Sequence, residues 1–262
     1  MHRIIATSLV TAVAATALTV APAQAASYAV TLKTSRTKAD VGTTFTLSGK
    51  VTGKSSGAKT LTVQRKIGSA AWTKLTTVKT TSTGAYSKAI TAKSTGAKAY
   101  RVVAPKSGST GSGTSPSVTV TGYTWLYLAD QPVTAVGGAV VDTPRRIDGK
   151  TYKKSIVLFG GSSLVAWNLQ QQCDQVTSAV TVDPKFSGPN PQSTTTEIGS
   201  TSGTLASAVA QLGSASPLAA NATGVGYLGF QVDGDDETTS PVDILSPRAH
   251  CSTTQLDDEV LL

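Results

Sequence analysis

The chain has 262 residues and a formal net charge of +8, a length that allows one or two domains. Threonine, alanine, serine, valine and glycine are the most frequent residues, methionine occurs once, and no long stretch has the apolar periodicity of a helix, so composition favours an all-β fold. Residues Ser27 to Gly122 hold 15 basic residues and one acid (net +14), whereas Tyr123 to Leu262 hold 7 basic and 14 acidic residues (net −7). This change at Gly122 and Tyr123 predicts a domain boundary.

Residues 1–25 have the pattern of a secretory signal peptide. Arg3 gives a positive start, Ile4 to Val20 form an apolar core, and Ala23-Gln24-Ala25 is a small-x-small cleavage signal. We expect cleavage after Ala25 and an extracellular, secreted protein, either free or associated with the cell wall. The alternative is a membrane anchor, which the threonines in the run and the cleavage signal disfavour. No later stretch is apolar enough to be expected to span a membrane.

Short alternating runs between glycine-containing turns predict seven strands in the domain at 27–122. The expected strands are Tyr28 to Leu32, Thr44 to Val51, Lys59 to Arg65, Trp72 to Lys79, Ala85 to Thr91, Ala97 to Val103 and Ser117 to Thr121. Such spacing is typical of an immunoglobulin-like sandwich. Its expected core residues are Leu47, Val51, Leu61, Val63, Trp72, Tyr86, Tyr100 and Val102.

The runs Val41 to Gly49 and Thr83 to Tyr86 resemble the bacterial immunoglobulin-like domains of secreted actinobacterial proteins, as do Val63 to Arg65 and Tyr100 to Val103. That resemblance implies a spacer or adhesion role. The many lysines of this domain have two interpretations: a surface that attracts anionic cell-wall polymers, or a solvated spacer. The lysines are scattered and have little aromatic interleaving, which favours the spacer and argues against specific nucleic-acid binding.

The domain at 123–262 is also expected to be all strand. Asp148-Gly149 forms the tip of a predicted turn at Ile147 to Lys150. Expected strands follow at Ser155 to Phe159, Leu164 to Leu169, Val176 to Val182, Thr194 to Gly199, Thr204 to Leu212, Leu218 to Thr223 and Gly226 to Val232. For Leu205 to Leu212 a short helix is the alternative, because alanines are frequent there. Trp167 lies mid-strand in an apolar run and is expected in the core.

Four motifs of this domain, in this order, resemble the NPCBM family of carbohydrate-binding modules. They are Tyr127 to Asp130, Gly149 to Tyr152, Val165 to Leu169 and Val180 to Asp183, and the acidic end from Leu256 to Leu262 continues the likeness. The resemblance covers about half the chain and implies a jelly-roll sandwich of the galactose-binding type. A histidine that the family often carries is replaced here by Phe159-Gly160-Gly161, so no role of that histidine is carried over.

The two cysteines, Cys173 and Cys251, are expected to form one disulfide, because an even pair in an exported protein usually does. Two free buried thiols are the alternative. Cys173 is predicted to begin the strand that runs to Asp183, and Cys251 to begin the final strand. The segment of Trp125 and Tyr127 is expected to pair with that last strand.

A sugar site needs an exposed ring beneath the apolar C–H face and polar groups for the hydroxyls. The predicted ligand-binding residues are Asp130, Tyr152, Phe159, Asp183 and Asp258. The alternative is that Asp130 and Asp258 only accept from backbone donors in turns. Possible ligands are glycans of the galactose type or cell-wall polysaccharides.

No cofactor, metal site or enzymatic activity is expected. Asp233, Asp235 and Asp236 lie in an acidic loop that could hold calcium, but the EF-hand pattern is incomplete and a solvated turn is favoured. After signal removal His250 is the only histidine, and there is no G-x-S-x-G motif. Function is therefore expected to be non-catalytic carbohydrate binding at the cell surface. The alternatives are a structural or adhesive protein without sugar binding, and a carboxylate-dependent glycoside hydrolase.

Overall fold

The computed structural model describes residues 26–160, 163–183, 193–233 and 240–257. The predicted signal peptide at 1–25 lies outside them, as do Asp258 and the acidic loop from 234 to 239. Strands make up most of the described chain, and the one short helix in that part is a 3-10 turn, η1 (Leu128–Asp130). The all-β fold class is thus confirmed. No helix in the described part is long and apolar enough to cross a membrane.

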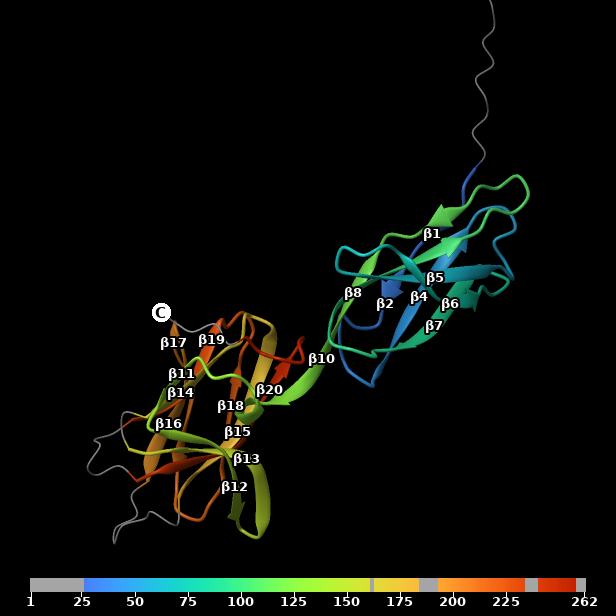
Figure 1. Cartoon of the computed structure of the whole chain (residues 1–262). Coiled ribbons are helices and arrows are strands. Elements are labelled where there is room, and N and C mark those ends of the chain that lie inside the picture. The colour runs from blue at the N-terminus through green and yellow to red at the C-terminus, as the bar shows by residue number, and fades with distance from the viewer. Residues whose placement is uncertain (1–25, 161–162, 184–192, 234–239, 258–262) are drawn as a thin grey trace, which may run out of the picture.

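The N-terminal lobe packs two layers of mostly antiparallel strands around one core (Figure 1). One layer contains β1 (Ala29–Val30), β2 (Lys33–Thr34), β4 (Thr44–Thr52) and β7 (Ala85–Thr91). The other contains β3 (Lys38–Asp40), β5 (Thr60–Ile67), β6 (Thr73–Lys79), β8 (Gly96–Ala104), β9 (Gly113–Thr114) and β10 (Val118–Tyr127). This is a sandwich of short strands, as the alternating runs predicted. The immunoglobulin-like family assignment stays a resemblance.

The expected core of this lobe is correct with one exception. Leu47, Val51, Leu61, Val63 and Val102 are all fully buried. Tyr86 and Tyr100 are buried too.

Trp72 is the exception, because it lies half-buried just before β6 rather than in the core. The Arg101 guanidinium stacks over its ring, with 4.4 Å between the guanidinium carbon and the ring centroid. A surface tryptophan can cover apolar area while a cation shields its other face.

The C-terminal lobe is a second sandwich. Its first layer contains β12 (Ala139–Ile147), β13 (Lys150–Leu158), β15 (Cys173–Val182), β18 (Ser216–Asn221) and β20 (Val242–Cys251). Its second layer has the order β11 (Ala135–Gly137), β14 (Leu164–Asn168), β19 (Tyr227–Asp233), β16 (Thr194–Ser200) and β17 (Gly203–Ala210). Trp167 is fully buried between the layers against Phe230, as expected. The stretch with a helical alternative, Leu205 to Leu212, is strand β17 as far as Ala210.

Strand β10 runs through both lobes and connects them (Figure 1). Val118 to Gly122 pair with β8 of the first lobe, and Thr124 to Tyr127 pair with β20 of the second. The segment of Trp125 and Tyr127 was expected to pair with a last strand that begins at Cys251, whereas its partner strand ends at that residue. Each lobe has its own buried core cluster. Val120 is the last residue in the chain that belongs to the N-terminal cluster, and Leu128 is the first that belongs to the C-terminal cluster. The proposed domain boundary at Gly122 and Tyr123 therefore falls inside a continuous strand, and the division into two domains stays a prediction.

Cys173 and Cys251 form a disulfide, as predicted. Cys173 begins β15, but Cys251 ends β20 instead of beginning a final strand, which corrects the sequence-based placement. The two residues are direct partners in the antiparallel register of β15 and β20. The disulfide therefore crosslinks β15 and β20 at one end of their pairing in the first layer.

Candidate functional site

A hollow opens on the first layer of the C-terminal lobe where β20 changes partners. Along one edge β20 pairs with β13 through Val242 to Ile244 and with β10 through Arg248 to Cys251. The residues between these two stretches, 245–247, face the gap between the end of β10 and β13. On its other edge β20 pairs with β15, and the register shifts there between Thr177 and Ala179. Such bulges bend a strand and redirect its side chains.

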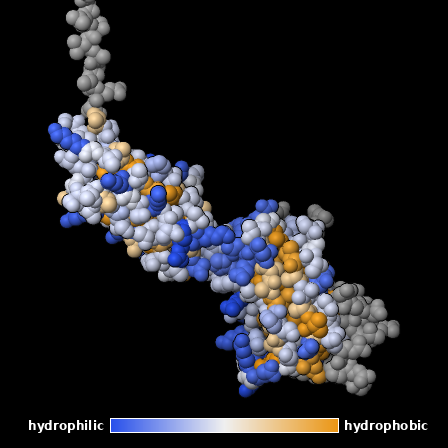
Figure 2. All heavy atoms as spheres, turned by 180° about the vertical axis from the view of Figure 1, so that it is seen from behind, coloured by the Kyte–Doolittle hydropathy of each residue, from blue (hydrophilic) through white to orange (hydrophobic). Residues whose placement is uncertain are grey.

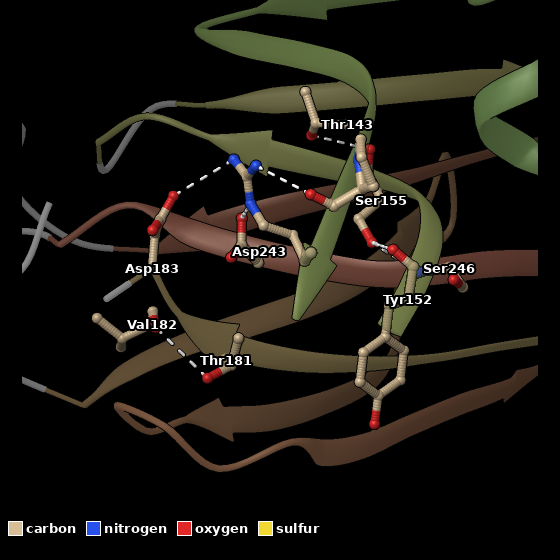
Figure 3. Close-up of polar contacts among 10 residues, drawn as sticks. Thr143, Tyr152, Ser155, Thr181, Val182, Asp183, Asp243 and Ser246 are labelled. Carbon is tan, nitrogen blue, oxygen red and sulfur yellow. Dashed lines mark hydrogen bonds and ion pairs between the residues drawn. The ribbon is translucent and has the colours of Figure 1, made fainter. Parts of the chain in front are cut away.

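Two kinked residues hold this gap open. Lys154 in β13 and Ser246 in β20 both adopt left-handed backbone conformations, with φ of 58° and 47°. The Ser246 N–H donates to Ser155 Oγ at 3.3 Å (Figure 3). The Ser246 hydroxyl donates to the Lys153 carbonyl. These bonds satisfy groups that a regular ladder would otherwise pair. The strands are thus locked in a bent arrangement.

The hollow has a volume of about 580 Å³. Its lining combines two aromatic rings, three cations and hydroxyl groups: Tyr127, Tyr152, Lys150, Lys153, Arg248 and Ser178. No Asp or Glu of the described residues belongs to the lining. A volume within the range of about 300–1,000 Å³ fits a site for a small ligand such as one or two sugar rings.

An aromatic row leads from the lobe junction to the hollow. Tyr123, Trp125 and Tyr127 alternate along β10 and therefore share one face of the strand. Trp125 and Tyr127 are 38% and 37% exposed, so ring surface is available to a ligand. The Arg248 guanidinium lies over both rings, with its carbon 5.7 Å from each centroid.

The row continues to the junction through His250. Its ring stacks on Tyr123 and lies tilted against Trp125, with centroids 4.9 Å apart in each pair. His250 Nδ1 lies 2.7 Å from Asp174 Oδ1, and Nε2 lies 2.9 Å from Asp40 Oδ1 on β3 of the other lobe. Strongly hydrophilic residues gather over this junction in Figure 2. The row is therefore fixed at its inner end by polar contacts between the lobes.

Of the four predicted ligand-binding residues that the structure describes, only Tyr152 lines the hollow. Its ring packs under Lys150, whose Nζ lies 4.7 Å from the centroid. Asp130 lies on η1 with its Oδ1 2.8 Å from Lys154 Nζ. Phe159 is 39% exposed just beyond the end of β13, away from the residues that line the hollow. Asp258 lies outside the described residues.

Asp183 lies in a buried ion cluster instead of at the surface. Its side chain is 1% exposed, and its Oδ2 lies 3.4 Å from Arg145 Nη2. The same guanidinium donates through Nε to Asp243 Oδ1 at 2.7 Å, and the Asp243 side chain is fully buried (Figure 3). In this arrangement Asp183 does not reach a ligand at the surface. The four predicted residues that the structure describes therefore lie in several places rather than in one site.

Sequence reasoning missed Arg248 and the role of Tyr127 in the hollow. The alternation Tyr123-x-Trp125-x-Tyr127 was a usable signal, because three aromatics at a spacing of two share one face of a strand. Arg248 gave no such signal, since it meets the row only through the pairing of β20 with β10.

Metal binding finds no support in the described part of the chain. No group of three or more His, Cys, Asp or Glu side chains there is arranged to hold a metal ion. The acids considered for calcium, Asp233, Asp235 and Asp236, have side chains outside the described set. The calcium alternative therefore stays untested.

Two solved structures show a distant structural likeness to this chain. No protein-family profile matches the chain, and no curated protein matches it. A solved structure of the CBM51-2 and INT domains of ZmpB from Clostridium perfringens aligns with a TM-score of 0.43 and 13% identity, covering 64% of this chain and 39% of that one. The same domains with CBM51-2 in complex with GlcNAc align with a TM-score of 0.42, 13% identity and the same coverage. The chain thus spans about two fifths of the length of these structures.

Proposed function

We propose that this chain is an exported, non-catalytic glycan-binding protein. The hollow of the C-terminal lobe holds the sugar, and the basic N-terminal lobe acts as a spacer. The signal-peptide pattern at 1–25 supports export. Galactose-type glycans and cell-wall polysaccharides are the first ligands to test, because the motif resemblance points to carbohydrate.

The observation that carries the proposal is the pair of tyrosine rings in one hollow. A pyranose ring stacks its C–H face on an aromatic ring and needs hydrogen-bond partners around its rim. Tyr127 and Tyr152 supply the rings, and Thr177, Ser178 and Ser246 supply hydroxyl groups in the same lining. Trp125 extends the aromatic surface along β10 for further sugar units of a chain.

The composition of the lining supports a binding role rather than hydrolysis. Glycoside hydrolysis needs a pair of carboxyl groups on either side of the bond that breaks. The described lining residues include no Asp or Glu. A ligand in the hollow would thus meet rings, hydroxyls and cations, and no carboxyl group of a described lining residue.

We expect Tyr127→Ala and Tyr152→Ala each to weaken glycan binding about tenfold, because each removes a stacking surface worth about 1 kcal/mol or more. A glycan array on the full mature chain would identify a ligand. Isothermal titration calorimetry with that ligand would then give the dissociation constants of both variants.

Trp72→Ala is the matched control, because Trp72 is also a surface aromatic stacked by an arginine but lies in the other lobe. Its affinity should equal that of the wild type. Phe159→Ala is a second control, because Phe159 was predicted from sequence to bind the ligand but does not line the hollow. If the ligand binds in the hollow, this variant should have wild-type affinity. Unchanged affinity in folded Tyr127→Ala and Tyr152→Ala variants would contradict the proposal, as would an array without any binding.

A further inference from the structure

The charge of the hollow differs from that of the lobe around it. Residues Tyr123 to Leu262 have a net charge of −7, with only seven basic residues. Three of those seven, Lys150, Lys153 and Arg248, line this one hollow, and no described acid lines it with them. An acidic lobe that collects its few cations around one concave surface creates a local positive potential there.

These three cations are not neutralised by neighbours. None of them forms a salt bridge with a residue that the structure describes, and all three side chains are exposed. Two other cations of the lobe are paired: Lys154 with Asp130, and Arg145 with Asp183 and Asp243. The cations just outside the hollow thus form salt bridges within the protein. The three cations in its lining have no salt-bridge partner among the described residues and can pair with an anionic ligand.

The cations also lie beside the rings that would stack a sugar. Arg248 lies over Tyr127, and Lys150 lies over Tyr152. Cation–π contacts at exposed sites are weak, so a bound anion can draw these groups away from the rings at little cost. A sugar stacked on either ring would thus have a cation within reach of its substituents. The planar fork of Arg248 can also bind a carboxylate, sulfate or phosphate through two parallel hydrogen bonds.

We propose that the hollow selects acidic sugars, whose carboxylate, sulfate or phosphate group pairs with Lys150, Lys153 and Arg248. This inference rests on the proposed glycan-binding function and adds the class of ligand to it. The site is distinct from the diffuse positive charge of the N-terminal lobe, because it combines cations with stacking rings in one concave surface. The three cations attract the anionic group. The tyrosine rings add stacking on a sugar, so an anion attached to a sugar should bind more tightly than a free anion.

The test compares ligands that differ only in charge. Calorimetry on the full mature chain would measure trigalacturonate and its methyl ester, which keeps the rings but removes the charges. Galactose, galactose 6-sulfate and galactose 6-phosphate would show which anionic group is preferred. We expect the acid to bind at least about tenfold more tightly than the ester, and this preference to fall as salt screens it.

The variant Lys150→Gln/Lys153→Gln/Arg248→Gln should bring the ratio of acid to ester affinity close to one. The readout is this ratio within one protein, so a loss of affinity that is common to both ligands does not affect it. The control Lys50→Gln/Lys74→Gln/Lys79→Gln removes the same charge from exposed positions of the N-terminal lobe and should keep the ratio. Arg248→Lys retains the positive charge at the hollow and should retain most of the preference for the acid over the ester. This variant shows whether a lost preference comes from the lost charge or only from altered packing on Tyr127.

Three results would overturn the inference. Equal affinity for acid and ester would do so while leaving glycan binding intact. A preference that survives in the hollow variant, or one that falls equally in the control variant, would place the anion contacts elsewhere. Absence of binding to any of the sugars, charged or neutral, would instead contradict the proposed function itself.

Discussion

Arg145 shows at the level of a single residue how this fold treats its buried charges. Its guanidinium contacts two carboxylates from different strands, Asp243 in β20 and Asp183 just after β15. Both carboxylates are almost completely buried, and the Arg145 side chain itself is only 14% exposed. Burying charge is costly unless it is paired. The three residues therefore depend on one another, and the cluster ties β12 to the strands beside it.

We expect Arg145→Ala to lower the free energy of unfolding by about 3–5 kcal/mol, because it leaves two buried carboxylates without the cation that they share. Urea denaturation would measure the loss. Arg146→Ala is the control, since Arg146 is the exposed neighbour on the same strand and its removal should change stability by less than about 0.5 kcal/mol. A loss below about 1 kcal/mol for Arg145→Ala would show that the cluster is not a stabilising contact.

Asp183 was predicted as a ligand-binding residue, but its side chain is buried in this cluster. In the sequence it is a lone acid after a strand and before a proline, which is typical of an exposed loop. Its partner Arg145 is 38 residues earlier in the chain, in a strand that no strong sequence pattern marked. Only the pairing of β12, β13, β20 and β15 brings the two together. Ion pairs of this range cannot be predicted from local pattern.

At the level of elements, the predictions that succeeded relied on local signals. Asp148 and Gly149 have φ values of 49° and 75°, the geometry that a two-residue Asp-Gly hairpin turn requires, and they connect β12 to β13. The longer strands of the N-terminal lobe, β4 to β8, follow their alternating patterns closely, whereas the short strands β2, β3 and β9 were not predicted. The hollow could not be predicted in this way. It depends on β20 having three partners, and on kinks at Lys154 and Ser246, which are not residue types that signal a left-handed backbone.

The disulfide between β15 and β20 gives a prediction at the level of elements. In the chain-entropy view, removing a crosslink between residues separated by 78 positions destabilises the fold by up to about 4.5 kcal/mol. We expect Cys173→Ser/Cys251→Ser to unfold at lower denaturant concentration by a corresponding amount. Reduced wild type should match this variant, whereas oxidised wild type should show no alkylatable thiol by intact mass. Equal stability of oxidised and reduced protein would contradict a structural role for the bond.

At the level of the whole molecule, the two lobes are joined by more than strand β10. Lys38 and Asp40 on β3 of the N-terminal lobe reach Asp174 and His250 of the C-terminal lobe. Lys38 Nζ lies 2.7 Å from Asp174 Oδ2, and His250 lies between Asp174 and Asp40. His250 also stacks on Tyr123 and contacts Trp125. The same contacts that join the lobes therefore hold the inner end of the aromatic row that leads to the hollow.

This junction should weaken in acid because of Asp174. Burial alone would raise the pKa of its carboxyl group, but hydrogen bonds and charge from Lys38 and His250 outweigh burial and hold the pKa below the ordinary value of 3.8. A carboxyl group with a lowered pKa in the folded state stabilises the protein above pH 3.8, and this contribution is lost as pH falls through the lowered pKa.

We expect Asp174→Asn to be less stable than wild type at pH 6, with the difference disappearing as pH falls below 3.8. Urea denaturation of both proteins at a series of pH values would measure it, with Asp148→Asn at the hairpin tip as the control that leaves stability unchanged. A difference between Asp174→Asn and wild type that stays constant across this pH range would mean that the ionised carboxylate does not stabilise the junction.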